Sequence, residues 1–487
     1  MSKKSALMVL ALVVVVALLI SGCVIPWPGS AKSLYLDAVS DGSGGVFVVW
    51  EDEGVAYGQR IDSEGNLRWG KGVALSTFRC WKPPHVTGDG SGGAIIVWTE
   101  AETRDEGYST PVTYAQRINS EGEVLWGQGG KPVPEVHALH RVVPDGSGGA
   151  IIVQSWRLIR LQRIDCEGNP VWSEEGVTVC TTVSGIGGDP SILVDGAGST
   201  TVAWVDNRAG GSRNDVYAQR VSPEGEIMWQ EDGVPVSVPC YGQTILRIVS
   251  DGSGGAIVGW LYRRVSGSIS QDTPMLDRFQ VHAQRLSPDG EPLWQEGGVQ
   301  VNTLPVASPY PLGMASDGAG GAVMAWHPSL SWGEERFPHE RFLLGLRAQW
   351  LDSEGNLQWP EPARLFVDVN VSGRVGAWGG MVAARVVADG SSGAIVIGVF
   401  QDSGPLPRAQ KLGPEGELLW KEGGVQLFPD PRAKSYENLQ VISDGSGGVI
   451  IVAEAGRRFF YRDRIYAQRM DSEGKLLWTD RGMRVDP

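Results

Sequence analysis

Beyond residue 34, the hydrophobic pattern along the chain has the period of β-strands, and helical periodicity is absent. Residues 94–98 (Ala-Ile-Ile-Val-Trp) are apolar throughout, and residues 113–118 (Thr-Tyr-Ala-Gln-Arg-Ile) alternate between apolar and polar. These two patterns predict a buried strand and a half-buried strand. Residues 84–87 precede this pair as a further strand signal, and we expect residues 123–126 (Glu-Val-Leu-Trp) to form the fourth strand of the unit.

This four-strand unit occurs eight times between residues 34 and 487, and three landmarks mark each copy. The first is the Asp of an Asp-Gly-x-x-Gly turn: Asp41, Asp89, Asp145, Asp195, Asp251, Asp317, Asp389 and Asp444. The second is a Gln inside the third strand: Gln59, Gln116, Gln162, Gln219, Gln284, Gln349, Gln410 and Gln468. The third is a Trp after a Gly-containing turn: Trp69, Trp126, Trp172, Trp229, Trp294, Trp359, Trp420 and Trp478. The mean period is about 58 residues.

Eight serial units of four strands predict an all-β fold, an eight-bladed β-propeller of four-stranded antiparallel blades over residues 34–487. The first repeat supplies its own innermost strand and the last supplies its own outermost strand near Val485, so we expect no strand to be shared across the ring. An array of β-sandwiches is the alternative, but such domains need about 100 residues each.

Length variation is confined to two of the four connections in each repeat. The turn Asp lies nine residues before the end of the second strand, and the Gln lies ten residues before the Trp, in every copy. The connections between the second and third strands, and between successive repeats, vary in length. In a propeller these two connections lie on the same face, so we expect an insertion-bearing binding face that is dominated by residues 261–283, 327–346 and 360–388. Neutral drift of surface loops is the alternative.

The segment 114–126 (Tyr-Ala-Gln-Arg-Ile-Asn-Ser-Glu-Gly-Glu-Val-Leu-Trp) resembles the tryptophan-docking repeat of quinoprotein-like propellers, although its turn is one residue shorter. The resemblance implies that the eight landmark tryptophans pack between neighbouring blades. Envelope-anchored members of that group include lipoproteins that act as scaffolds. The adjacent Cys pair of the quinone-dependent enzymes does not occur in this sequence, so we expect neither quinone chemistry nor any other cofactor.

The N-terminal segment has the features of a lipoprotein signal. Two lysines precede an apolar run at residues 6–20, and Ile20-Ser21-Gly22-Cys23 resembles the bacterial lipobox. We expect a signal peptide at residues 1–22, lipidation of Cys23, a tether at residues 23–33, and an extracytoplasmic location at the cell envelope. An uncleaved membrane anchor with an incidental Cys is the alternative.

Composition and charge narrow the choice of partners. The net charge of −14 argues against a nucleic-acid partner, because phosphate binding needs a basic face. The five Cys residues are too few for a disulfide scaffold. The pair His137 and His140 has no third ligand fixed by spacing, so we expect no metal site.

These observations favour a binding or scaffold protein that is not an enzyme and that contacts a protein or a carbohydrate through its insertion-bearing face. The candidate contact residues are Trp81, His85, Asp206, Arg208, Asp272, Trp332, Glu334 and Trp378. The alternative is an extracytoplasmic hydrolase acting on glycans, with loop carboxylates as its acid and base. The carboxylates considered for that role are Asp206, Asp272, Glu334 and Glu335.

Overall fold

The computed structural model places most of the chain between residues 35 and 486. Within that range it does not describe residues 78, 103–109, 137–138, 156–157, 182–188, 209, 211–213, 239–243, 264–278, 303–311, 327–345, 367–380, 391–392, 401–405, 429–432, 434 and 457–463. The described residues form strands and turns, with no helix among them. The signal peptide and tether predicted at residues 1–33 lie outside the described residues.

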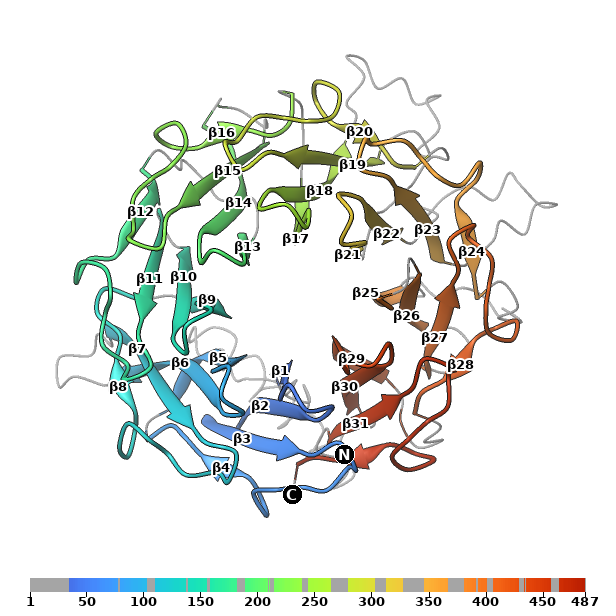
Figure 1. Ribbon diagram of the computed structural model, residues 1–487. Coiled ribbons are helices and arrows are strands. Elements are labelled where there is room, and N and C mark those ends of the chain that lie inside the picture. Colours follow the sequence, from blue (N-terminus) through green and yellow to red (C-terminus); the bar gives the residue numbers. More distant parts are fainter. Residues whose placement is uncertain are drawn as a thin grey trace, which may run out of the picture.

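The strands form eight separate four-stranded sheets arranged as the blades of a ring (Figure 1). Blades 1 and 2 are β1 (Leu36–Ser40), β2 (Val46–Asp52), β3 (Val55–Ile61), β4 (Val73–Ala74), β5 (Cys80–Gly88), β6 (Ala94–Glu102), β7 (Thr110–Ile118) and β8 (Lys131–Pro132). Blades 3 and 4 are β9 (Leu139–Pro144), β10 (Ala150–Ser155), β11 (Ile159–Ile164), β12 (Val177–Cys180), β13 (Ser191–Val194), β14 (Thr200–Asp206), β15 (Asp215–Val221) and β16 (Val234–Pro235).

Blades 5 and 6 are β17 (Thr244–Ser250), β18 (Ala256–Arg263), β19 (Phe279–Leu286), β20 (Val299–Gln300), β21 (Gly313–Ser316), β22 (Ala322–Trp326), β23 (Leu346–Leu351) and β24 (Ala363–Leu365). Blades 7 and 8 are β25 (Met381–Ala388), β26 (Ala394–Phe400), β27 (Leu406–Leu412), β28 (Val425–Gln426), β29 (Ser435–Ser443), β30 (Val449–Gly456), β31 (Arg464–Met470) and β32 (Met483–Arg484).

Neighbouring strands in each blade are consecutive in sequence and antiparallel, and the first strand of each blade lies nearest the axis of the ring (Figure 1). Blade 1 contains β1–β4 and blade 8 contains β29–β32, so no strand is shared where the ring closes. The prediction of an eight-bladed propeller of four-stranded antiparallel blades is confirmed.

The fourth strand predicted at residues 123–126 is wrong. Val124 makes only an isolated bridge to Ile118, and the outermost strand β8 begins after the Trp. Trp126 leaves the sheet because its backbone N–H donates to Oε1 of the buried Gln116 (2.9 Å), whose amide group donates to the carbonyl of Gly127 (2.6 Å). The buried Gln landmark therefore holds the loop that carries the Trp.

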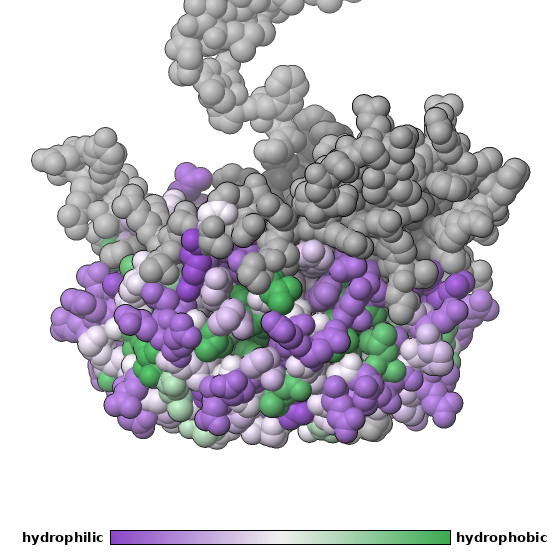
Figure 2. All heavy atoms as spheres, turned by 90° about the horizontal axis from the view of Figure 1, so that it is seen from above, coloured by the Kyte–Doolittle hydropathy of each residue, from purple (hydrophilic) through white to green (hydrophobic). Residues whose placement is uncertain are grey.

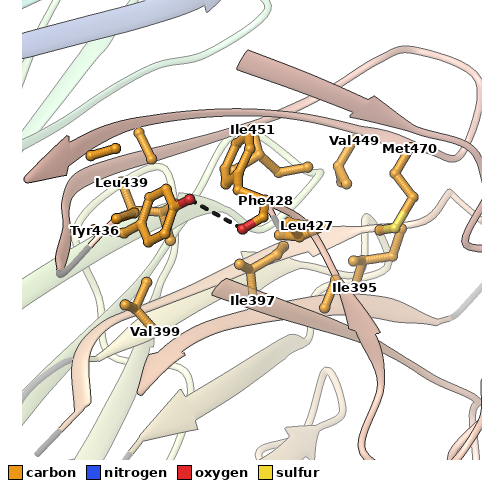
Figure 3. Close-up of a cluster of buried hydrophobic side chains, with 14 residues drawn as sticks. Ile395, Ile397, Val399, Leu427, Phe428, Tyr436, Leu439, Val449, Ile451 and Met470 are labelled. Carbon is orange, nitrogen blue, oxygen red and sulfur yellow. Dashed lines mark hydrogen bonds between the residues drawn. The ribbon is translucent and has the colours of Figure 1, made fainter. Parts of the chain in front are cut away.

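The apolar faces of adjacent blades pack against each other to form the core. Between blades 7 and 8, Ile397 of β26 and Ile451 of β30 belong to one buried cluster (Figure 3). The hydroxyl of Tyr436 in this cluster donates to the carbonyl of Phe428 (3.1 Å), which satisfies the buried polar group. A similar cluster, which includes Val48 and Val452, joins blade 1 to blade 8.

Each landmark Trp reaches the turn between the third and fourth strands of the next blade. The indole N–H of Trp69 donates to the carbonyl of Ser120 in blade 2 (3.0 Å), and a Cβ added to Gly122 would lie 2.7 Å from the Trp69 ring. Gly122 has a φ of +90°. Glycine is therefore needed at this position both for its backbone conformation and for room beneath the indole. The same indole-to-carbonyl bond is made by Trp126, Trp172, Trp229, Trp294, Trp359 and Trp478.

A second polar contact accompanies the Trp in most blades. Arg60, which follows the Gln landmark, pairs with Asp41 of the first turn (2.9 Å) and also donates to the carbonyl of Ser120 (3.3 Å). Burial alone would raise the pKa of Asp41, but hydrogen bonds from Ser43, Arg60 and Gly45 outweigh it and lower that pKa. Equivalent pairs join the turn Asp to Arg117, Arg163, Arg220, Arg285, Lys411 and Arg469.

We expect Trp229→Ala to lower the free energy of unfolding by about 3–5 kcal/mol, because it removes a buried indole between blades 4 and 5. Met228→Ala is the matched control. Met228 is next to Trp229 in the sequence but is 51% exposed, so its replacement should change stability little. Urea unfolding of both variants checks this. Equal stability of the two variants would contradict a packing role for Trp229.

Candidate functional site

The two faces of the ring differ in their connections. On one face, here called the turn face, lie the Asp-Gly turns and the turns that receive the tryptophans. On the other, the loop face, lie the strand ends that are joined by the variable connections. Strand β18 ends at Arg263 and β19 begins at Phe279. The insertion predicted at residues 261–283 is therefore limited to residues 264–278. Likewise β23 begins at Leu346, and the range 360–388 contains β24 and β25.

Asp206 and Arg208 lie at the loop face of blade 4 and form a clamp to blade 3. Asp206 is fully buried, and its carboxylate accepts hydrogen bonds from Trp204 Nε1 (2.8 Å) and from the Arg208 guanidinium (2.6 Å). Arg208 also donates to Sγ of Cys180 on β12 (3.1 Å), and its guanidinium lies 3.7 Å from the centroid of the Tyr217 ring. These contacts join Arg208, which follows β14 in blade 4, to β12 of blade 3.

The charges within this clamp stabilise each other. Burial would lower the pKa of Arg208, but the ion pair with Asp206 outweighs it and the pKa is raised. Asp206 is therefore bound to Arg208 in an ion pair without access to solvent. Such a carboxylate is poorly suited to acid–base catalysis, which needs contact with a substrate.

Trp81 and His85 both lie on β5, the innermost strand of blade 2. Trp81 is near the loop-face end of the strand, where 45% of its surface is exposed and the Lys82 ammonium lies 5.6 Å from its ring. His85 lies within β5, as the strand signal at residues 84–87 predicts, and its Nδ1 contacts Oδ2 of Asp37 on β1 (3.1 Å). Trp81 is thus exposed near the loop face, whereas His85 joins two inner strands.

The other candidate residues lie outside the described residues. They are Asp272, Trp332, Glu334, Glu335 and Trp378. Their roles, and the glycan hydrolase alternative, stay predictions. Within the part of the chain that the structure describes, no group of three or more His, Cys, Asp or Glu side chains could hold a metal ion. The same part contains no helix that is long and apolar enough to cross a membrane.

Two arrangements were missed from the sequence although both leave a signal in it. An Arg directly follows the Gln landmark in six repeats, which is the residue that pairs with the turn Asp. In blade 4, the negatively charged Asp206 and the positively charged Arg208 are two residues apart at the end of a strand, in the sequence Trp204-Val205-Asp206-Asn207-Arg208. Because alternate residues of a strand share a face, the Trp and the Asp could have been expected to meet.

No family model and no curated protein matches the chain. Solved structures do resemble it. The β-propeller domain of the Trilobed protease from Pyrococcus furiosus is 12% identical, with a TM-score of 0.38 over 92% of this chain and 99% of that one. Polysaccharide lyase Uly1 is 11% identical, with a TM-score of 0.42 over 78% and 88% of the two chains.

A Pyrococcus horikoshii acylaminoacyl peptidase is also 11% identical, with a TM-score of 0.40 over 83% of this chain and 53% of that chain. These likenesses concern the fold and carry no argument about activity.

Proposed function

We propose that the protein is a lipid-anchored β-propeller of the cell envelope that binds a protein or carbohydrate partner through its loop face and is not an enzyme. The observation that carries this proposal is the asymmetry of the ring. The turn face repeats the same short turns, whereas the loop face carries all the variable connections. A rigid scaffold that varies only one set of loops is typical of binding proteins.

The exposed Trp81 supports a contact surface on this face. An indole with nearly half its surface exposed beside a Lys suits the stacking of a sugar ring or the burial of a peptide side chain. On the outer wall, by contrast, hydrophobic residues are scattered in small patches among polar ones (Figure 2). The packing of each landmark Trp on a Gly of the next blade also supports the proposed resemblance to quinoprotein-like propellers. That resemblance concerns the way the blades pack and not an activity.

The direction of β1 determines which face of the ring lies near the N-terminal segment. Leu36, at the start of β1, pairs with Trp50, while Ser40 at its other end leads into the turn at Asp41. The strand therefore begins at the loop face. If Cys23 is lipidated, the steps from it to Leu34 span at most about 40 Å. The loop face would then lie near the bilayer, and we infer that the partner is bound close to the membrane surface.

Replacing Cys23 with Ser tests the anchor. The variant should take up no palmitate label and should leave the membrane fraction or retain its signal peptide, because no thiol is present to be acylated. Labelling and fractionation of the wild type and the variant measure this. Palmitate uptake equal to that of the wild type would contradict lipidation at Cys23.

Shortening the loops tests the binding face. Residues 264–278 and 327–345 would each be replaced by the two-residue turn of blade 1, Glu53-Gly54, whose φ angles of +51° and +92° suit a tight hairpin. A pulldown from envelope extract should lose partners that the wild type retains. Leu125→Ser, at an exposed position on the turn face, is the control and should retain them. An unchanged partner set with an unchanged melting curve would contradict the proposal.

A further inference from the structure

Three arginines occupy the same level of the innermost strands. Arg141, Arg247 and Arg385 each lie four residues before the turn Asp of their blade. Each pairs with the residue eight positions after that Asp: Arg141 with Val153, Arg247 with Gly259 and Arg385 with Ile397. Equal register in equivalent strands puts the three residues at one height, roughly 13 Å along the strand from the turn.

These arginines come from blades 3, 5 and 7; blades 3 and 7 face each other across the ring, and blade 5 lies midway between them (Figure 1). The other five positions of this level are Asp37, His85, Ser191, Gly313 and Gln440. Strands β9, β17 and β25 are not neighbours, so their side chains can meet only by reaching toward the axis.

The charges on the three side chains do influence one another. Burial lowers the pKa of Arg247, and the positive charge of Arg141 lowers it further. Burial likewise lowers the pKa of Arg385 to about 10, and both Arg247 and Arg141 contribute. A nearby positive charge lowers the pKa of a base in this way.

The negative groups nearby are few. Asp37 accepts from His85 and from the backbone N–H of Val86 (3.2 Å). Asp189, before β13, lies near enough to Arg247 to raise its pKa. Arg385 donates to the carbonyl of Ala384 (3.1 Å), and no carboxylate among the described residues forms an ion pair with it. The three arginines thus place positive charge at one level of the innermost strands, in a chain whose net charge is −14.

We propose that Arg141, Arg247 and Arg385 form a binding site on the axis of the ring for a small anion that carries two or more negative charges on carboxylate or phosphate oxygens. Guanidinium groups bind such oxygens in pairs and remain charged when partly buried. Ser191 and Gln440 at the same level offer further hydrogen-bond donors. An anion between the arginines would offset the repulsion that their convergence creates. The site does not depend on the loop face or on the anchor.

Calorimetric titration of the full chain in an uncharged detergent tests the site, with pyrophosphate and citrate as probes. Acetate and NaCl of matched ionic strength are the controls. We expect one pyrophosphate or citrate per chain, and at least a tenfold loss of affinity in Arg247→Gln and in Arg385→Gln. Arg68→Gln is the matched control, because that side chain is 54% exposed and pairs with Asp62 away from the axis.

Thermal unfolding provides a second readout. Either probe should raise the melting temperature of the wild type and of Arg68→Gln but not that of the two axial variants. Without a probe, the axial variants should melt no lower than the wild type, since they remove repulsion. Binding of pyrophosphate alone would identify a phosphate site, and binding of citrate alone a carboxylate site. No binding beyond the NaCl control, or equal affinity in all four proteins, would overturn the proposal.

Discussion

The fit of one tryptophan onto one glycine of the next blade is the contact on which the ring depends. The blades share no strand, so no backbone hydrogen-bond ladder joins the first blade to the last. The ring closes through the same Trp-to-turn contact that joins the other blades. Trp478 of blade 8 donates to the carbonyl of Ser63 in blade 1 (3.1 Å) and covers Gly65. Arg469 donates to the same carbonyl (3.2 Å), so a polar and an apolar contact coincide there.

This contact also explains why the connections on the two faces of the ring differ in how much their lengths vary. The turns that receive the tryptophans must keep a glycine at fixed spacing. The Asp-Gly turns must keep the Asp that pairs with the Arg next to the Gln landmark. Insertions there would separate the blades. The connections on the loop face join strand ends that take no part in these contacts, so their lengths can differ from blade to blade.

The repeats and the number of blades were predictable because the landmarks recur at fixed spacing. The position of the fourth strand was not, because residues 123–126 have the composition of a strand, and the hydrogen bond from the Trp126 backbone to the Gln116 side chain that takes Trp126 out of the sheet leaves no local pattern in the sequence. The sequence predicts Asp206 as a loop carboxylate, whereas the structure buries it in an ion pair with Arg208. The axial arginines were missed because each is a single charge in an apolar strand, and only strand register brings them to one level.

The most direct measurement compares two glycine-to-alanine variants by urea unfolding. Gly65 (φ +92°) lies under Trp478, where an added Cβ would be 2.8 Å from the ring, whereas Gly146 (φ +79°) has nothing within 4 Å of that position. Both variants bear the cost of a positive φ, about 1–2 kcal/mol. We predict that Gly65→Ala loses clearly more stability than Gly146→Ala, because it also displaces the indole that closes the ring. Equal losses in the two variants would contradict a closure that depends on this contact.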